Sequence, residues 1–199
     1  MLKVGLTGGI GSGKSIVCKV FESMGIPVYQ ADAAAKKLYD TDDELRNSLK
    51  SLFGEHLYAS GSLDRRKLAE IIFSNDENLR KINELVHPAV KKDFLKYVSL
   101  LPETTPYAIH EAAILYEAGI AHIFDLVINV YAPESIRIKR VVVRENTTEK
   151  DVKQRIASQW NDELKVKLSD YNIINDDKTP VLPQIFKIHE EICRLAGRN

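Results

Sequence analysis

Gly8-Gly9-Ile10-Gly11-Ser12-Gly13-Lys14-Ser15, near the start of this 199-residue chain, decides how the rest of the sequence is interpreted. The stretch matches the pattern G-x-x-x-x-G-K-[ST], in which glycines let the backbone curl around phosphate oxygens and direct N–H groups at them. Lys14 would bring a positive charge to the β- and γ-phosphates, and the hydroxyl of Ser15 would bind Mg²⁺. The stretch therefore predicts a loop that binds the phosphates of a nucleotide.

The residues on either side of this loop have the character that such a loop requires. Residues 2–6 alternate as in a strand, and apolar side chains recur at helical spacing over residues 17–24. A helix that begins at about Gly13 would add the positive end of its dipole to the phosphate site. Ile16 stands where a second hydroxyl is common, but its backbone N–H is retained, so the prediction of nucleotide binding holds.

Composition and charge restrict the class of protein. Apolar residues make up 44% and charged residues 28% of the chain, as in ordinary globular proteins. Basic and acidic residues both number 28, so no overall field attracts nucleic acid or an anionic membrane. No apolar run is long enough for a signal peptide or a membrane span. We expect a cytoplasmic protein with Cys18 and Cys193 as buried free thiols and with no nucleic-acid or membrane partner.

Strands alternate with helices along much of the sequence. A short strand is expected to end at about residues 30–32, and a final helix is expected over residues 181–195. This alternation predicts an α/β fold with a mainly parallel, doubly wound sheet. The other expected strands cover residues 2–6, 107–115, 125–131 and 170–175.

Two long helical runs interrupt this alternation. The first has helix-type spacing over residues 33–39, 43–53, 65–73 and 78–98, and the second covers residues 134–167. Such insertions suit a kinase, which must cover two substrates and exclude water during transfer. The predicted parts are a nucleotide-binding core of residues 1–31, 106–133 and 168–199, a helical substrate-binding insertion of residues 32–105, and a helical lid of residues 134–167.

Asp32 follows the second expected strand at the edge of the sheet where ligands of open α/β folds bind. Phosphoryl transfer depends on positioning and electrostatics, and a carboxylate here would accept or orient the proton of an acceptor hydroxyl. Asp is equally favoured as the N-cap of a helix that begins at Ala33. The sequence leaves these two interpretations of Asp32 equally open.

Arg137, Arg140 and Arg144 are spaced three and four residues apart, which places them along one face of a helix. A lid with such a stripe would close on a triphosphate and stabilise transition-state charge. The alternative is a solvated basic face, the usual explanation of a charge run.

Two further residues are candidates on weaker grounds. Glu111, after the third expected strand, would bind Mg²⁺ through water. His87, which precedes Pro88, fits better with a hydrogen-bonded structural histidine.

With these residues in view, the sequence resembles the dephospho-CoA kinase family over nearly its whole length. Residues 4–15 are similar to the start of the family, and Ala31-Asp32 matches the end of its Asp-Ala-Asp motif. The resemblance also rests on residues 61–65, 86–90 and 173–175 and on Arg140, Arg144, Arg155 and Gln159.

The resemblance implies a three-layer α/β/α fold of the P-loop NTPase type with a five-stranded sheet. It implies transfer of the ATP γ-phosphate, with Mg²⁺, to the ribose 3′-hydroxyl of dephospho-CoA. The implied catalytic residues are Asp32, Lys14, Arg140 and Arg144. ATP is expected to contact Gly8, Gly9, Ile10, Gly11, Ser12, Gly13, Lys14, Ser15, Ile16 and Asn175, and dephospho-CoA to contact Thr7, Asp32, Lys36, Arg65 and His87.

Four positions depart from the family pattern. Gln30 replaces the first Asp of the triplet, Ala113 replaces a Pro, and Ile16 replaces a Thr. Lys36 stands where Arg is common, which keeps the charge but loses the bidentate fork that suits a phosphate. None of these changes removes the phosphate loop or Asp32.

Two alternative functions follow from the same residues. One is a kinase for another small acceptor, such as a nucleoside monophosphate or a shikimate-like alcohol. The other is a nucleotide-binding regulatory protein without catalysis. The absence of an Asn-Lys-x-Asp or a Leu-Ser-Gly-Gly-Gln sequence disfavours GTPases and transporter ATPases, and a monomer is the expected state.

Overall fold

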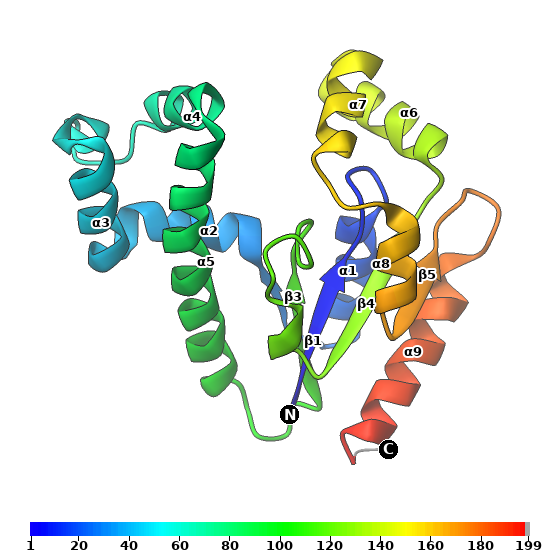
Figure 1. Cartoon of the computed structure of the whole chain (residues 1–199). Helices are drawn as coiled ribbons and strands as arrows, with labels where there is room; N and C mark the ends of the chain where they lie inside the picture. The colour runs from blue at the N-terminus through cyan, green and yellow to red at the C-terminus, as the bar shows by residue number, and fades with distance from the viewer. Residues whose placement is uncertain (198–199) are drawn as a thin grey trace. The chain divides into compact units, whose positions relative to one another are not determined.

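The computed structural model describes residues 1–197, without the side chains of residues 73, 74 and 76 (Figure 1). The chain forms two compact units. The first unit comprises Met1–Tyr29 and Leu101–Asn199, and the second comprises Gln30–Leu100. The first unit contains the phosphate loop and most of the sheet, whereas the second is almost entirely helical.

A five-stranded sheet in the order β2-β3-β1-β4-β5 forms the centre of the first unit. Strand β1 pairs in parallel with β3 and β4, and β4 pairs in parallel with β5. The predicted α/β fold with a mainly parallel sheet is confirmed. Because β1 is the central strand, the phosphate loop that follows it begins at the middle of the carboxyl-terminal edge. The strands are β1 (Leu2–Thr7), β2 (Val28–Gln30), β3 (Tyr107–Glu111), β4 (Leu126–Tyr131) and β5 (Tyr171–Ile174).

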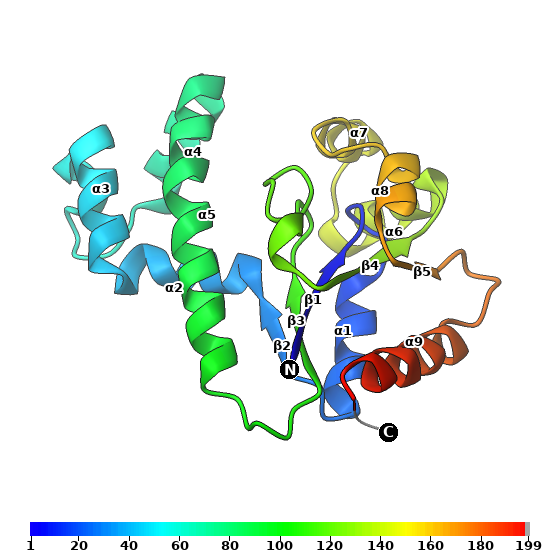
Figure 2. The ribbon, with the colours of Figure 1, turned by 60° about the horizontal axis from the view of Figure 1, so that its bottom comes forward.

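Helices α1 (Lys14–Ser23) and α9 (Val181–Leu195) lie side by side on one face of the sheet (Figure 2). Their inward residues recur at helical spacing and pack on Val4 and Leu6 of β1, which are fully buried. The core cluster also includes Val17, Cys18, Phe21, Ile185, Ile188 and Ile192.

The opposite face of the sheet is covered by the segment after β3. A side chain at Gly5 would place its Cβ 2.6 Å from Leu115 and 3.0 Å from Phe124, so glycine lets this segment approach β1. Strand β3 ends at Glu111, and the expectation that it continues to Leu115 is wrong, because residues 112–119 turn back through hydrogen bonds such as Gly119 N–H to Tyr116 C=O.

The second unit consists of α2 (Ala31–Thr41), α3 (Asp43–Phe53), the short 3₁₀ turn η1 (Glu55–Tyr58), α4 (Arg65–Ser74) and α5 (Asp76–Ser99). Asp42, Asp64 and Asn75 each accept a hydrogen bond from a backbone N–H in the first turn of the helix that follows, so the sequence marks these helix starts. The helical character predicted for this part of the chain is confirmed.

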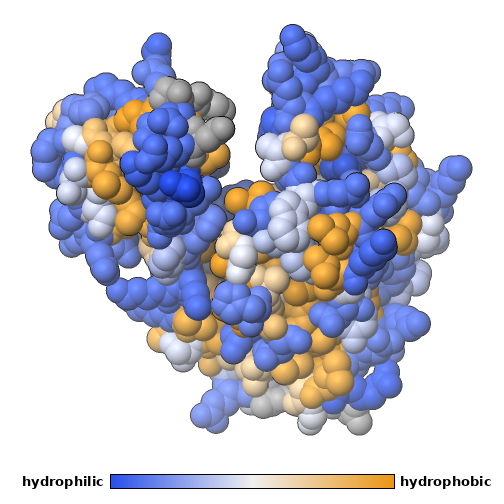
Figure 3. Space-filling model, in the orientation of Figure 1, coloured by the Kyte–Doolittle hydropathy of each residue, from blue (hydrophilic) through white to orange (hydrophobic). Residues whose placement is uncertain are grey.

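Three helices follow β4: α6 (Glu134–Glu145), α7 (Glu149–Ala157) and α8 (Asp162–Leu168). Asn146, whose φ is 49°, is the C-cap of α6, and α7 begins with a capping box of Thr148 and Asp151. Most side chains of α7 are exposed, and the outer part of α6 and α7 is mostly hydrophilic on the face shown in Figure 3. These helices belong to the first unit, and their separate movement as a lid stays a prediction.

The two cysteines are free thiols, as predicted. Cys18 is buried, and burial raises its pKa to about 12, with the nearby Glu111 adding to the shift. Cys193 is half-buried rather than buried, and its Sγ lies 3.7 Å from Nε2 of His189 one helical turn earlier. Within residues 1–197 there is no helix with the length and apolar character needed to cross a bilayer.

Candidate active site

The backbone of the phosphate loop depends on its glycines. Gly13 is the N-cap of α1 with a φ of 101°, in the left-handed region that favours glycine. A Cβ at Gly13 would also lie 2.2 Å from Nδ2 of Asn175. The N–H of Ser12 donates to the C=O of Gly9 at 3.1 Å and closes a turn inside the loop. Glycine at residue 13 is therefore required both by the backbone and by the close approach of Asn175.

Several N–H groups of the loop are available to a ligand. The amides of Gly11, Gly13 and Ser15 make no hydrogen bond to other described residues, and the amide of Ser15 lies in the first turn of α1. Such amides together with the helix dipole form an anion site. Ser15 and Ile16 are both exposed, and Ile16 leaves 64% of its surface accessible.

Lys14 lies over the start of the loop. Its Nζ donates to the C=O of Gly8 at 2.9 Å and to the C=O of Gly9 at 3.4 Å. The ammonium is thus held at the same end of the loop as the carboxyl terminus of β1. This position suits a group that neutralises phosphate charge.

Arg137 of α6 is almost fully buried, with 2% of its side chain exposed. It donates to the C=O of Ile10 at 3.4 Å and forms an ion pair with Asp162. Burial raises the pKa of Asp162, and the neighbouring Arg137 opposes that shift. For Arg137, the interpretation as part of a solvated basic face is wrong.

Arg140 joins the loop to the segment after β5. Its guanidinium donates to the C=O of Gly11 and of Ser12, both at 3.4 Å, and to the backbone and side-chain oxygens of Asn175, both at 3.1 Å. It also contacts Oδ1 of Asp177 at 2.5 Å. Asn175 in turn donates from Nδ2 to the C=O of Ser12 at 2.7 Å. Arg140 and Asn175, both predicted to be site residues, therefore lie together at the loop.

Arg144 has a different environment from the other two arginines. Its side chain is 59% exposed and pairs at 2.5 Å with Glu145, which also pairs with Arg155. The two arginines, Arg155 first, lower the pKa of Glu145. Arg144 makes no hydrogen bond to the loop within the described part of the chain, so its catalytic role stays a prediction.

Thr7 and Glu111 lie at the carboxyl-terminal edge of the sheet, on the adjacent strands β1 and β3. Thr7 is fully buried, and its hydroxyl donates to the C=O of Ala113 at 3.5 Å. Glu111 is half-buried on the strand next to the loop. No group of three or more His, Cys, Asp or Glu suited to a metal occurs among residues that the structure describes. A Mg²⁺ that keeps several waters needs fewer protein ligands than that, so the exposed hydroxyl of Ser15 and the carboxylate of Glu111 fit such an ion.

In the second unit, Asp32 lies in the first turn of α2 and is exposed. The N-cap of this helix is Gln30, because α2 begins at Ala31 directly after β2. The interpretation of Asp32 as an N-cap is therefore wrong. Its carboxylate makes no hydrogen bond or ion pair with any residue of the described chain.

Two of the other residues predicted to bind substrate are adjacent within this unit. Arg65 donates to the C=O of Lys36 at 3.0 Å and pairs with Asp40 at 3.6 Å. The side chain of Lys36 is exposed. His87 is half-buried in α5, and burial lowers its pKa, as expected for a structural histidine. Substrate contacts of these residues stay predictions.

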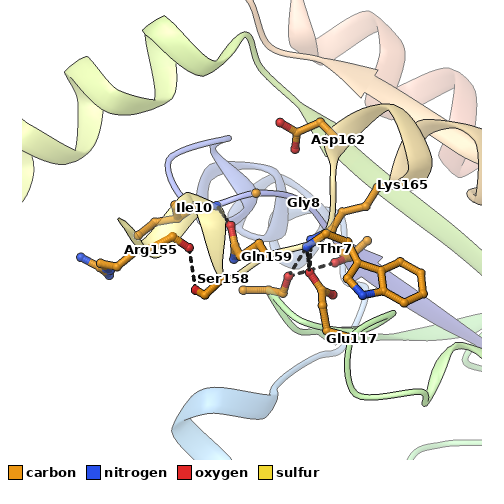
Figure 4. Close-up of polar contacts among 12 residues, drawn as sticks. Thr7, Gly8, Ile10, Glu117, Arg155, Ser158, Gln159, Asp162 and Lys165 are labelled. Atoms are coloured by element: carbon orange, nitrogen blue, oxygen red, sulfur yellow. Dashed lines mark hydrogen bonds and ion pairs between the residues drawn. The ribbon is translucent and has the colours of Figure 1, made fainter. Parts of the chain in front are cut away.

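Several residues that contact the loop region were not predicted to be site residues, although Gln159 is among those on which the family resemblance rests. Gln159 accepts a hydrogen bond from the N–H of Ile10 at 2.9 Å (Figure 4). Asp162 pairs with Arg137, and Asp177, whose φ is 64°, pairs with Arg140. No periodic pattern marks these residues, since each lies in or beside a turn and meets a partner distant in sequence. The one local signal is the tolerance of Asp for the left-handed conformation found at Asp177.

Comparison with known proteins agrees with this geometry. The sequence model of the dephospho-CoA kinase family matches residues 2–180. The chain is 40% identical to the dephospho-CoA kinase of Bacteroides fragilis strain YCH46, over 94% of this chain and 91% of the relative. It is 39% identical to the dephospho-CoA kinase of Porphyromonas gingivalis strain W83, over 96% of this chain and 95% of the relative.

Solved structures show the same relationship. The crystal structure of TT1252 from Thermus thermophilus has a TM-score of 0.82 and 31% identity and covers 97% of this chain and 96% of its own. Dephospho-CoA kinase from Campylobacter jejuni has a TM-score of 0.70 and 26% identity, with 96% and 97% covered. Shikimate kinase from Acinetobacter baumannii has a TM-score of 0.53 at 13% identity, with 98% and 94% covered, and shares only the fold. From its loop geometry and its match over residues 2–180, the chain belongs to the dephospho-CoA kinase family.

Proposed function

We propose that this chain transfers the γ-phosphoryl group of ATP to the ribose 3′-hydroxyl of dephospho-CoA and releases coenzyme A and ADP. The observation that carries the proposal is the family match over residues 2–180 of a chain whose phosphate loop keeps Lys14 and has amides, those of Gly11, Gly13 and Ser15, that make no hydrogen bond to the described residues. ATP and dephospho-CoA are thus the proposed partners.

The ATP side of the reaction would be performed by the loop and by α6. The amides of Gly11, Gly13 and Ser15 would bind phosphate oxygens, and Lys14 would neutralise charge as it develops between the β- and γ-phosphates. Arg140 lies next to the same amides and would stabilise the transferring group. Mg²⁺, held by Ser15 and through water by Glu111, would supply further charge neutralisation.

The acceptor side would depend on the helical unit. The exposed carboxylate of Asp32 would orient the 3′-hydroxyl and take its proton as the new oxygen–phosphorus bond forms. Lys36 and Arg65 supply positive charge suited to the phosphates of dephospho-CoA, and His87 would contribute packing or a hydrogen bond. A monomeric state and a cytoplasmic location complete the proposal.

An acceptor panel tests this function. The purified protein with ATP and Mg²⁺ is given dephospho-CoA, AMP or shikimate, and ADP release is followed. The proposal expects rapid ADP release with dephospho-CoA and little with the other two. Faster turnover with AMP or shikimate would identify a kinase of another acceptor, and tight ATP binding without transfer to any acceptor would indicate a regulatory nucleotide-binding protein.

A further inference from the structure

Gln159 contacts the phosphate loop from the turn between α7 and α8 (Figure 4). Its Oε1 accepts a hydrogen bond at 2.9 Å from the N–H of Ile10, and Arg137 donates to the C=O of the same residue at 3.4 Å. Both backbone polar groups of Ile10 are therefore bound by side chains that lie 149 and 127 residues later in the chain.

The peptide bond between Gly9 and Ile10 has Gln159 on one edge and Lys14 on the other. No cis peptide occurs in the described part of the chain, so the C=O of Gly9 and the N–H of Ile10 point in opposite directions. The C=O of Gly9 accepts from Lys14 Nζ at 3.4 Å and from the N–H of Ser12 at 3.1 Å. Gln159 thus holds the N–H edge of this peptide, and Lys14 and Ser12 hold its C=O edge.

The turn that carries Gln159 is itself fixed to the segment after β3. The N–H of Trp160 donates to Oε1 of Glu117 at 2.8 Å, and the same carboxylate pairs at 2.7 Å with Lys165, which is fully buried. The ring of Trp160 stacks on that of Tyr116, with 6.1 Å between centroids and 9° between planes. The carboxamide of Gln159 is consequently presented by a rigid element.

The loop needs such a support because glycines surround the Gly9–Ile10 peptide. Gly8 has a φ of 149° and Gly11 a φ of 80°, and glycine backbone rotates at low energetic cost. Rotation of this peptide would turn the C=O of Gly9 away from Ser12 and open the turn that the loop contains. The backbone that carries the amides of Gly11 and Gly13, which follows this turn, would then change its conformation.

We propose that Gln159 is a positioning residue of the phosphate loop, whose carboxamide keeps the Gly9–Ile10 peptide from rotating and so maintains the loop conformation in which the amides of Gly11, Gly13 and Ser15 bind the nucleotide phosphates. This role deepens the proposed kinase function and rests on its nucleotide-binding step alone, without reference to the acceptor.

Two variants of similar length separate the hydrogen bond from the shape of the side chain. Gln159→Met keeps the volume and loses the acceptor, whereas Gln159→Glu keeps an acceptor for the N–H of Ile10. Gln154→Met on α7 is the matched control, because Gln154 is exposed and its side chain makes no hydrogen bond to described residues. The readouts are amide hydrogen exchange at Ile10, without added nucleotide, and calorimetric binding of ADP and ATP.

We expect Gln159→Met to speed exchange at Ile10 and to weaken ADP and ATP binding, each roughly three- to tenfold, as the loss of one hydrogen bond predicts. Gln159→Glu should restore slow exchange at Ile10, and Gln154→Met should match the wild type in both readouts. Unchanged exchange at Ile10, or nucleotide affinity within twofold of wild type in a folded Gln159→Met protein, would overturn the role of Gln159.

A variant that does not fold, and a failure of the proposed kinase function, can both be distinguished from a failure of the role of Gln159. If Gln159→Met does not fold, Gln159→Glu decides the matter, since fast exchange at Ile10 in that folded variant would contradict the proposal and slow exchange would support it. A wild-type protein that binds ADP through this loop but does not phosphorylate dephospho-CoA would refute the proposed function and leave the role of Gln159 intact.

Discussion

The phosphate loop and the helical unit differ in how firmly the chain holds their candidate site residues. Around the loop, Lys14, Arg140 and Asn175 each make hydrogen bonds of 2.7 to 3.4 Å to the loop backbone. In the helical unit, Asp32 and Lys36 are exposed, and their side chains make no hydrogen bond to the residues described. Under the proposed function, the protein itself positions the groups that would bind ATP, whereas the acceptor would order the side chains of Asp32 and Lys36.

This difference follows from topology and side-chain entropy. The loop follows the central strand at the carboxyl-terminal edge of the sheet, where α6 and the segments after α7 and β5 contact it. Residues on the exposed surface of a helix have no such neighbours, and a free Lys side chain retains its rotamer entropy until a ligand binds. Changes at the loop should therefore alter ATP binding and turnover, and changes in the helical unit should alter use of the acceptor.

Removal of the loop cation should have the largest effect. Lys14→Ala should lower kcat/KM by at least about 10³-fold, because the preorganised charge on the triphosphate is lost. Steady-state kinetics with ATP varied at saturating dephospho-CoA measures this loss. A kcat/KM within tenfold of wild type would show that Lys14 is not required for catalysis.

Substitution of Asp32, the exposed carboxylate of the helical unit, tests whether this unit affects turnover without affecting ATP binding. Asp32→Asn should lower kcat by about 10³-fold, since proton acceptance is lost, and leave the Kd for ATP within twofold. Single-turnover kinetics and calorimetry measure the two quantities. Weakened ATP binding would contradict the separation between the two regions, and near-normal turnover would exclude Asp32 as base or positioner.

Two arginines of α6 provide an internal control. Arg140→Ala should lower kcat/KM by about 10²-fold because its contacts include the loop and Asn175. Arg144→Ala should have a smaller effect, since in the structure Arg144 pairs only with Glu145 among the described residues. Parallel kinetics of the two variants test this order, and a larger loss for Arg144→Ala would show that α6 moves during catalysis.

The smallest predicted effect concerns stability. His110 of β3 lies between the rings of Tyr29 and Phe124, and burial lowers its pKa to about 4. An unfolded His binds its proton below about pH 6.5, so the folded state loses stability as the pH falls from about 6.5 toward 4. At pH 5 this loss is roughly 2 kcal/mol relative to pH 7.5.

His110→Phe keeps the aromatic packing and should remove this part of the acid sensitivity of the first unit. Urea unfolding at pH 7.5 and pH 5 measures it, with His122→Gln at an exposed histidine as the control. An equal loss of stability in wild type and His110→Phe would show that other groups cause the acid sensitivity.

Local sequence patterns predicted the elements well. The loop glycines, the alternating apolar residues of β1 and the helical spacing of α9 identified these elements, and the predicted bounds of α9, residues 181–195, are those of the structure. The second and third strands were less well bounded, because a strand that turns directly into a helix or a loop leaves no break in apolar pattern. Asp32 was for this reason taken as a candidate N-cap, although Gln30 has that position.

Contacts between distant segments were not predictable from the sequence. The spacing of Arg137, Arg140 and Arg144 placed them on one helix face, yet their side-chain exposures are 2%, 28% and 59%. The gradient arises because the phosphate loop and Asp162 cover only the first half of α6. The contact between Gln159 and Ile10 joins residues 149 positions apart and depends on the turn after α7.

Transfer of a labelled phosphoryl group tests the central claim most directly. The protein is incubated with Mg²⁺, dephospho-CoA and ATP that carries ¹⁸O in its γ-phosphate, and the products are analysed by mass spectrometry and ³¹P NMR. The account predicts coenzyme A with the labelled phosphoryl group on the ribose 3′-oxygen, formed in equal amount to ADP. ADP formed with the label in inorganic phosphate, and no labelled coenzyme A, would contradict it.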